Sequence, residues 1–463
     1  MRLSCRFRSL PFAAPAAMPL PSFPRPSPGP RPFRPARPLS LALAAAVLAG
    51  CAGAPPRTAV PVASVVSATA PAESSQPPAA AVPAQDFARW VDRLRAELRA
   101  KGIGETALNA AFGDVRFLPD VIERDRAQPE FTRPVWAYLD AAVSPGRIAR
   151  GRAKLEDVRA AAEAAQARYG VPAEIVVAIW GMESDYGRFY GDIRTIDALA
   201  TLGFEGRRRD WARGELLAAL RIVENGDIDP AHMIGSWAGA MGQTQFLPSN
   251  FLAYAVDADG DGRRDIWGSM ADVTASTANF LARSGWRAGQ PWGLEVTLPA
   301  GFDVARADPA LRQPSTQWAA EGVRAADGQP LPAIDDGAVL LPAGARGPAF
   351  LVGPNFRALL RYNASDSYAL AVGLLAQQIA RGGPGAADGP VVRAAWPREL
   401  VPLTRSELRT LQATLNERGF ASGEPDGLLG PATRGALRRY QRAQGLPADG
   451  FPTQDLLQRL QAP

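Results

Sequence analysis

A glutamate in the segment 180–187 (WGMESDYG) has the surroundings expected of a proton donor. Ile175, Val176 and Ile179 form an apolar stripe at helical spacing, and steps of three and four residues carry that stripe onto Glu183. A carboxyl group on the core-facing side of a helix is desolvated, which raises its pKa and favours a proton that can be donated. A partly buried carboxylate in a structural ion pair is the alternative interpretation.

The helix that presents Glu183 is predicted to be amphipathic and to run between Pro172 and Gly187. Proline suits the first turn, where its missing N–H costs nothing, and glycine suits the exit. Asp185 follows two residues after Glu183, about 200° further round a helix of 3.6 residues per turn. We therefore expect Asp185 to point away from Glu183, which leaves one carboxyl group for the chemistry.

Carboxylates also recur at alternate positions of the loop 257–265 (DADGDGRRD). They match positions 1, 3 and 5 of an EF-hand loop, a glycine matches position 6, and a backbone carbonyl is available at position 7. Position 12 usually supplies a bidentate glutamate but is Gly268 here, so a later acid could serve only if the loop is longer than usual. The sequence therefore predicts a site for calcium or another hard cation, and an ordinary acidic turn is the alternative. The predicted ligands are Asp257, Asp259, Asp261, Arg263 and Asp272.

Two further segments combine polar groups with small or aromatic residues. Segment 235–242 is rich in small residues that let backbone approach a ligand, and Ser236 and the following Gln245 offer hydrogen bonds suited to an acetamido or hydroxyl group. Tyr362-Asn363 and Tyr368 form an aromatic and polar group that suits the face of a sugar. Close helix packing and an ordinary aromatic core are the alternative explanations.

The first 50 residues have the features of a bacterial export signal. They hold seven arginines and no acid, and 39–50 is an apolar run too short to span a bilayer. Cys51 follows Leu-Ala-Gly, which resembles the lipobox at which bacterial lipoproteins are cleaved and acylated; an ordinary signal peptide with an incidental cysteine is the alternative. Ala52 after the cysteine indicates the outer membrane, and Met18 is an alternative start because the leader is long.

Composition excludes several classes of protein. Removing the seven leader charges from the net charge of +5 leaves −2, so bulk charge does not indicate a nucleic-acid binder. After cleavage Cys51 would be the only cysteine, which rules out a disulfide framework or a cysteine-based metal site within the chain. One acyl anchor would tether the protein to a membrane that it does not span.

Changes in composition divide the chain into parts. We expect a signal peptide over 1–50, a lipidated Ala/Pro-rich tether over 51–85, a catalytic domain over 86–382, a linker over 383–400 and a small unit over 401–461. Helical spacing predominates from Asp86 through 150, and again at 156–169, 196–202, 214–223 and 355–381. Region 288–355 favours β-structure, with candidate strands at 294–298 and 338–341. The predicted fold class is mainly α (α+β).

Several of these segments, in the same order and spacing, resemble the membrane-bound lytic murein transglycosylase B family, glycoside hydrolase family 103. The resemblance covers about 86–381 and rests on 183–187, 195–202, 235–248 and the Asp257 loop. It implies a lysozyme-like catalytic core with helical and small β subdomains. It also implies that Glu183 is the catalytic acid/base, that the Asp257 loop binds a metal, and that the residues lining the glycan cleft are Ser236, Gln245, Tyr362, Asn363, Tyr368 and Tyr138.

The tail resembles a second family, the peptidoglycan-binding-like domain, a small three-helix module. The resemblance rests on the two Asp-Gly turns at 426–427 and 449–450 and on the pair Tyr440-Gln441. Leu408, Leu411 and Leu415 would supply its first helix. A generic helical appendage is the alternative.

The sequence therefore predicts a lytic transglycosylase that cleaves the MurNAc–GlcNAc β-1,4 bond of peptidoglycan without water and forms 1,6-anhydro-N-acetylmuramic acid ends. A hydrolytic muramidase on the same substrate and a non-catalytic wall-binding lipoprotein are the alternatives. No cofactor is expected for the chemistry, and Ca²⁺ is expected to be structural. The expected partners are glycan strands and outer-membrane lipid through acylated Cys51, on the periplasmic face of a Gram-negative outer membrane. We expect a monomer that binds no nucleic acid.

Overall fold

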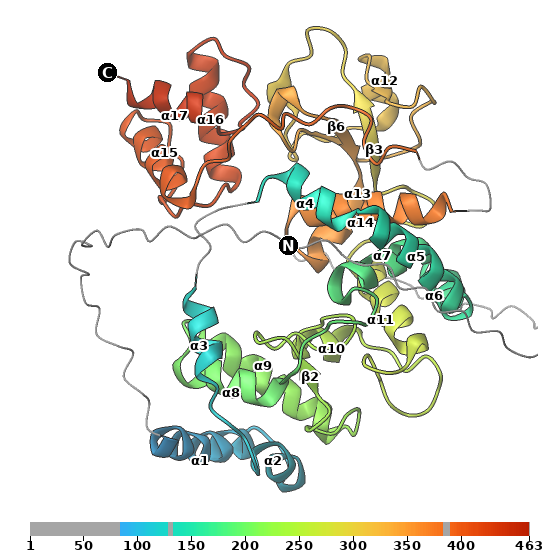
Figure 1. The fold of residues 1–463 in the computed structure, drawn as a ribbon, viewed down its shortest axis with the longest axis vertical. Helices are drawn as coiled ribbons and strands as arrows, with labels where there is room; N and C mark the ends of the chain where they lie inside the picture. Colours follow the sequence, from blue (N-terminus) through green and yellow to red (C-terminus); the bar gives the residue numbers. More distant parts are fainter. Residues whose placement is uncertain (1–83, 128–132, 383–388, 463) are drawn as a thin grey trace, which may run out of the picture. The chain divides into compact units, whose positions relative to one another are not determined.

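The computed structural model describes residues 84–127, 133–382 and 389–462. The leader, Cys51 and the tether lie outside these ranges. Within them the chain is mostly helical, with short strands between the helices (Figure 1). None of the helices in the described ranges has both the length and the hydropathy needed to cross a bilayer.

The first helices lead up to the segment that carries Glu183. Arg159 begins a helix after Asp157 ends the previous one, because Val158 leaves helical geometry at φ −109° and ψ 13°. The helix predicted at 156–169 is thus the end of one helix and the whole of the next. These helices are α1 (Ala84–Ala100), α2 (Glu105–Phe112), α3 (Pro119–Arg126), α4 (Val135–Ala142), α5 (Pro145–Asp157) and α6 (Arg159–Tyr169).

Glu183 lies in α7 (Ala173–Ser184), which is the central helix of the catalytic domain. This helix packs against α5, α6, α11 and α14 (Figure 1). Its residues from Ile175 to Gly181 are all buried, so it is apolar around its whole circumference. The prediction of an amphipathic helix was therefore wrong, because neighbours cover every side of α7 over these residues.

Helices and a two-stranded ladder follow α7. Strand β1 (Ile193–Arg194) pairs antiparallel with β2 (Ile234–Gly235), which brings the start of segment 235–248 beside the chain that leaves α7. This close approach requires a glycine at position 191, since a Cβ there would lie 1.9 Å from the carbonyl oxygen of Gly235. The helices of this part are α8 (Thr195–Glu205), α9 (Arg209–Glu224), α10 (Pro248–Tyr254) and α11 (Met270–Arg283).

The region predicted to favour β-structure forms an antiparallel sheet with its own apolar core around Trp318 and Leu351. The strand order is β4-β3-β6-β5, and both predicted strands are present as β3 and β5. The elements are β3 (Gly293–Thr297), η1 (Val304–Arg306), α12 (Ser315–Ala320), β4 (Arg324–Ala325), β5 (Ala338–Leu340), η2 (Gly344–Arg346) and β6 (Ala349–Val352).

The predicted helical stretch 355–381 consists of α13 (Pro354–Tyr362) and α14 (Asp366–Ala380), which return to pack beside each other. The tail forms a separate core from α15 (Arg405–Glu417), α16 (Pro431–Ala443) and α17 (Gln454–Gln461). Leu408, Leu411 and Leu415 are buried in that core, as the helical spacing predicts. The mainly α fold class and the three-helix tail are confirmed.

Candidate active site

Glu183 lies in the last turn of α7, where its carboxyl group receives a hydrogen bond from the hydroxyl of Tyr368. The side chain keeps partial access to solvent, although protein atoms surround it closely. This desolvation raises the pKa of Glu183 to about 7, while the hydrogen bond from Tyr368 acts in the opposite direction. A carboxyl group with this pKa is protonated in a substantial fraction of the molecules near neutral pH and can donate its proton.

Tyr368 reaches Glu183 from α14, whose start is fixed by Ser365. The Ser365 hydroxyl accepts a hydrogen bond from the backbone N–H of Tyr368 and caps the helix. The ring of Tyr368 is buried and stacks on Tyr362, with centroids 6.5 Å apart. Burial, followed by the charge of Glu183, raises the pKa of Tyr368 well above its usual range, so the phenol remains a donor.

The end of α7 keeps the next carboxyl group away from this site. Asp185 occupies the left-handed conformation with φ 48°, which turns the chain out of the helix. Its carboxylate accepts hydrogen bonds from Arg150 at 2.9 Å and Arg188 at 3.1 Å, and Arg147 lies 3.7 Å away. As expected, Asp185 points elsewhere, and its three arginine neighbours commit it to an ion cluster.

A buried network ties the end of α7 to segment 243–245. The hydroxyl of Ser184 donates to the carbonyl of Gln243 at 2.9 Å, and the indole of Trp180 donates to the Gln243 side-chain oxygen at 2.8 Å. The amide nitrogen of Gln243 donates in turn to the carbonyl of Trp267 at 2.6 Å. The sequence did not indicate that Gln243 connects these segments by hydrogen bonds, because the residue type does not show where its side chain points.

Gln245 and Ser236, two of the predicted glycan-contacting residues, make hydrogen bonds within the protein and keep one group each for a ligand. Gln245, at φ 52°, donates both to the carbonyl of Tyr190 and to that of Gly242 at 2.9 Å. This leaves its side-chain oxygen as an acceptor. Ser236 accepts a hydrogen bond from the Ala240 N–H at 3.1 Å, which leaves its own proton to donate.

The aromatic residues of the prediction differ in their exposure. Tyr362 is half-buried, and its hydroxyl donates to the carbonyl of Thr244 at 2.7 Å, which holds segment 243–245 against α13. Asn363 follows as the exposed C-cap of α13. Tyr138 of α4 is half-buried, and after desolvation it is the charge of Glu183 that most raises its pKa. Tyr138, Tyr362 and Tyr368 are therefore all within electrostatic reach of Glu183.

The Asp257 loop folds into a compact turn around its own carboxylates. Asp257 accepts hydrogen bonds from the N–H groups of Gly260 at 2.7 Å and Gly262 at 3.0 Å. Asp272, buried at the start of α11, accepts from Ala258 and from Asp265, both at 2.7 Å. The later acid thus does close the loop, in place of the glutamate that position 12 lacks.

Three of the five predicted ligands come together here. One oxygen each from Asp257, Asp259 and Asp272 lies within 4.8 Å of the others. Two oxygens that share a calcium ion at about 2.4 Å are separated by at most twice that distance, so the spacing suits one ion. The side chain of Asp261 instead accepts the Arg263 N–H at 2.8 Å and does not belong to this group of carboxylates. The donor set is all oxygen, as a hard cation requires.

Comparison with known proteins places the chain in a family. Residues 86–377 match the model of the family described as "Transglycosylase SLT domain". The chain belongs to this family of lytic transglycosylases. Residues 404–460 match a second family, described as "Putative peptidoglycan binding domain". Both resemblances inferred from the sequence are confirmed, and with them the classification of the chain as a peptidoglycan lytic transglycosylase, a lyase.

Individual relatives agree with this membership. Membrane-bound lytic murein transglycosylase B of Escherichia coli (strain K12) is 35% identical over 250 residues, which are 52% of this chain and 66% of that protein. SltB3 from Pseudomonas aeruginosa, solved with NAG-anhNAM-pentapeptide, is 51% identical, with a TM-score of 0.77 over 81% of this chain and 99% of that chain. The Escherichia coli lytic transglycosylase SLT35, solved with calcium, is 31% identical, with a TM-score of 0.54 over 63% of this chain and 92% of that chain.

Proposed function

We propose that this chain cleaves the MurNAc–GlcNAc β-1,4 bond of peptidoglycan without water and that Glu183 is its single acid/base. The observation that carries the proposal is the raised pKa of Glu183, about 7, at a site where Asp185 is held by arginines. Hydrolysing glycosidases commonly employ two carboxyl groups on either side of the scissile bond. One carboxyl group that first gives and then takes a proton suits an intramolecular reaction better.

In the first step Glu183 protonates the glycosidic oxygen, and the bond between that oxygen and C1 of the muramoyl residue breaks. The acetamido oxygen of the substrate steadies the positive charge at C1. In the second step the Glu183 carboxylate takes the proton of the C6 hydroxyl, whose oxygen bonds to C1 and closes the 1,6-anhydro ring. The proton count balances, and Glu183 returns to its starting state.

Tyr368 has a distinct part in this scheme. Its hydrogen bond is stronger to the carboxylate than to the carboxylic acid, so it supports Glu183 after the first proton has left. The bond also fixes the side chain of Glu183, which must face the glycosidic oxygen and then the C6 hydroxyl. Tyr368 is thus proposed to position the acid as well as to line the glycan site.

Glycan contacts are proposed for Ser236, Gln245, Tyr362, Asn363 and Tyr138. The free acceptor of Gln245 and the free donor of Ser236 are suited to acetamido and hydroxyl groups. SltB3 from Pseudomonas aeruginosa was solved both with NAG-NAM-pentapeptide and with NAG-anhNAM-pentapeptide, a substrate-like and an anhydro ligand. Those complexes support an anhydro product for this relative.

Product analysis tests the reaction. Digestion of purified sacculi, followed by mass spectrometry, should give fragments with 1,6-anhydromuramic acid ends. The hydrolytic alternative adds one water to each cleavage and leaves reducing muramic acid. Fragments that all carry reducing ends would refute transglycosylation, and an unaltered digest by Glu183→Gln would show that the acid lies elsewhere.

We also propose that the Asp257 loop binds one structural Ca²⁺ through Asp257, Asp259 and Asp272, with Asp261 and the Arg263 carbonyl as outer candidates. The three-carboxylate group and the calcium complex of SLT35 support this assignment. The ion would neutralise charges that otherwise repel one another and would hold the loop onto α11. The reaction does not pass through it.

A location at the periplasmic face of the outer membrane is proposed through acylation of Cys51. Its support is the lipobox-like sequence 48–51 and a relative named as membrane-bound. Cell fractionation of Cys51→Ala tests it: the protein should move from the membrane fraction to the soluble periplasm. Continued membrane association of this variant would contradict an anchor at Cys51.

A further inference from the structure

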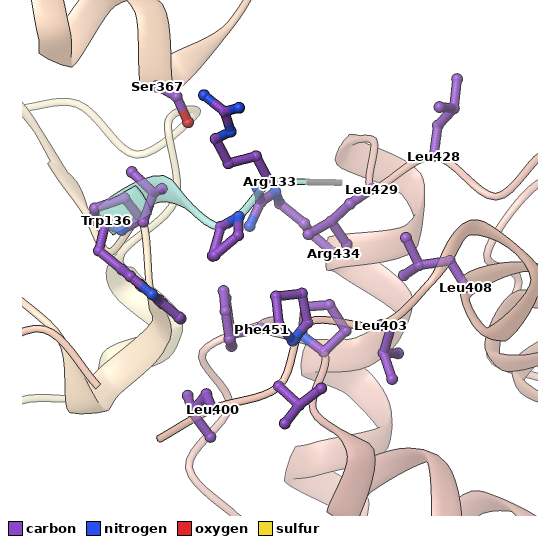
Figure 2. A pocket seen from close by; sticks show the side chains of 16 residues that line it. Arg133, Trp136, Ser367, Leu400, Leu403, Leu408, Leu428, Leu429, Arg434 and Phe451 are labelled. Atoms are coloured by element: carbon purple, nitrogen blue, oxygen red, sulfur yellow. The ribbon is translucent and has the colours of Figure 1, made fainter. Parts of the chain in front are cut away.

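A pocket of about 210 Å³ lies between the catalytic domain and the C-terminal module (Figure 2). Trp136 and Ser367 border it from the catalytic side, and Leu408, Leu428 and Leu429 border it from the module. The linker before α15 also contributes to its wall. Neither the proposed reaction nor the Asp257 loop makes use of this pocket.

The pocket combines apolar walls with cationic groups. Val401 and Leu428 line it and remain 67% and 51% exposed, whereas large apolar side chains in the described ranges are rarely so exposed. Arg133 and Arg434 also line it, together with the Ser367 hydroxyl. An apolar surface that also presents guanidinium groups and a hydroxyl suits a ligand with a carboxylate and small apolar side chains.

Arg434 is the more enclosed of the two arginines. Burial lowers its pKa, and the charge of Asp366 acts against that effect. Among the described residues no carboxylate makes a hydrogen bond or ion pair with its guanidinium, although Asp366 and Asp449 act on it from a distance. A desolvated guanidinium without a close counter-ion gains from a carboxylate that enters the pocket.

Two pairs of residues connect the pocket to the catalytic site. Ser367 lines it, and the next residue, Tyr368, donates its hydrogen bond to Glu183. On the other side, the charge of Arg133 acts on Tyr138, which also senses the charge of Glu183. Consecutive Cα atoms lie about 3.8 Å apart and a peptide of five residues extends up to about 17 Å, so a stem peptide on a muramoyl sugar at Glu183 has the length to extend past Tyr368 toward Ser367.

We propose that this pocket binds the carboxylate end of the stem peptide carried by the glycan, with Arg133 and Arg434 on the carboxylate and the leucine side chains against its methyl groups. The inference rests on the proposed function, since it takes the glycan with its peptides as the substrate. The pocket would then favour binding of glycan strands whose peptides end in a free carboxylate.

The test measures binding of a sugar-free stem pentapeptide, labelled at its N-terminus, to the full chain by fluorescence anisotropy. A matched peptide that ends in a carboxamide should bind about tenfold more weakly, because it loses the charge-assisted hydrogen bonds. Arg434→Met and Arg133→Met should weaken the carboxylate peptide to a similar degree and abolish the difference between the two peptides. Arg459→Met, an exposed arginine of α17 that does not line the pocket, is the matched control.

Leu428→Asp supplies a second variant, since this exposed side chain can be replaced without disturbing a core. It should also weaken binding of the carboxylate peptide. Equal affinity of the wild-type chain for the acid and amide peptides, or no binding of either, overturns the proposal. Because no bond is cleaved in this assay, such a result together with intact cleavage of peptide-free glycan would leave the proposed reaction standing and remove only the peptide site.

Discussion

The hydroxyl of Tyr368 donates a hydrogen bond to Oε1 of Glu183, joining two residues that are 185 positions apart in the chain. Glu183 lies in the last turn of the central helix α7 and Tyr368 in the first turn of α14, so the packing of these two helices brings the hydroxyl to the carboxyl group. Burial raises the pKa of Glu183 and the hydrogen bond lowers it. The value of about 7 is the balance of these two effects.

Replacing Tyr368 by phenylalanine removes the opposing effect. The pKa of Glu183 should rise further, so the alkaline limb of the kcat/KM profile should move to higher pH. At the same time kcat should fall by about tenfold, since the carboxylate formed in the first step loses a charge-assisted hydrogen bond. Tyr362→Phe is the comparison, because its hydroxyl serves Thr244 and not Glu183, and the limb should stay in place. An unshifted limb in Tyr368→Phe would contradict the role given to Tyr368.

Glu183→Gln keeps the shape of the side chain and removes its proton chemistry. The release of anhydromuropeptides should fall by roughly 10²–10⁴-fold, the usual contribution of a general acid or base. In the wild type, activity should decline as the pH rises through about 7, because Glu183 must be protonated to begin the reaction. Activity that is constant from pH 6 to about pH 9 would exclude a titrating acid with this pKa.

The same substitution should change the pH dependence of stability. The pKa of Glu183 is higher in the folded chain, about 7, than its ordinary value of 4.5, so the folded state binds the proton more tightly. Stability is therefore lost as the pH rises from about 4.5 through 7, where the buried group must ionise. Glutamine does not ionise, so the variant should be more stable than the wild type at pH 8, by up to about 3 kcal/mol. Urea denaturation of both proteins at pH 5 and pH 8 measures the difference, and a difference that is equal at both pH values would be inconsistent with a buried acid.

Sequence periodicity predicted helices in the regions of α1 to α9, α13 and α14, and two of the strands, because apolar spacing records which faces are covered. It did not predict α10, α11 or α12. Periodicity was misleading for α7, because neighbouring helices cover every side of it and no polar face shows its orientation. Only the packing against α5, α6, α11 and α14 shows why Glu183 is enclosed. The break at Val158 had no local signal, because valine there is not a strong helix-stop residue. The separation of α13 from α14 did have a local signal in Ser365, which caps α14, but apolar spacing alone did not reveal it.

The sequence also predicted the site in part. Residue types indicated an acid and polar sugar-binding groups, and helical phase placed Asp185 away from Glu183. The direction of each hydrogen bond could not be read in this way. Tyr368 faces Glu183, whereas Tyr362 faces the carbonyl of Thr244, yet both are tyrosines in the same short segment. Asp272 closes the Asp257 loop although it lies beyond the usual twelfth position, because the start of α11 turns it back.

Calcium should stabilise the fold through the Asp257 loop. At a free concentration of 100 times its Kd, one ion contributes about 2.7 kcal/mol, which is roughly 4 °C in Tm for a domain of about 300 residues. Differential scanning fluorimetry with excess chelator should show a fall of this order, and added Ca²⁺ should restore the Tm. Asp259→Asn should abolish the response, whereas Asp303→Asn, an exposed acid outside the loop, should keep it. A wild-type Tm that ignores chelator would return the loop to an ordinary turn.

Removal of residues 401–463 separates the module from the chemistry. The module has its own core around Leu411, Leu415 and Leu437, and Glu183 and Tyr368 lie outside it, so the remaining domain keeps its acid. Binding to insoluble sacculi in a pull-down assay should weaken, by about tenfold or more if the module supplies a second contact with the same polymer. Cleavage of short peptide-free glycans should persist. The exposed ion-pair variant Arg459→Met controls for changes on the module surface that do not alter its fold. Equal loss of sacculus binding and of short-glycan cleavage would mean that the module supports the catalytic domain and does not hold the wall.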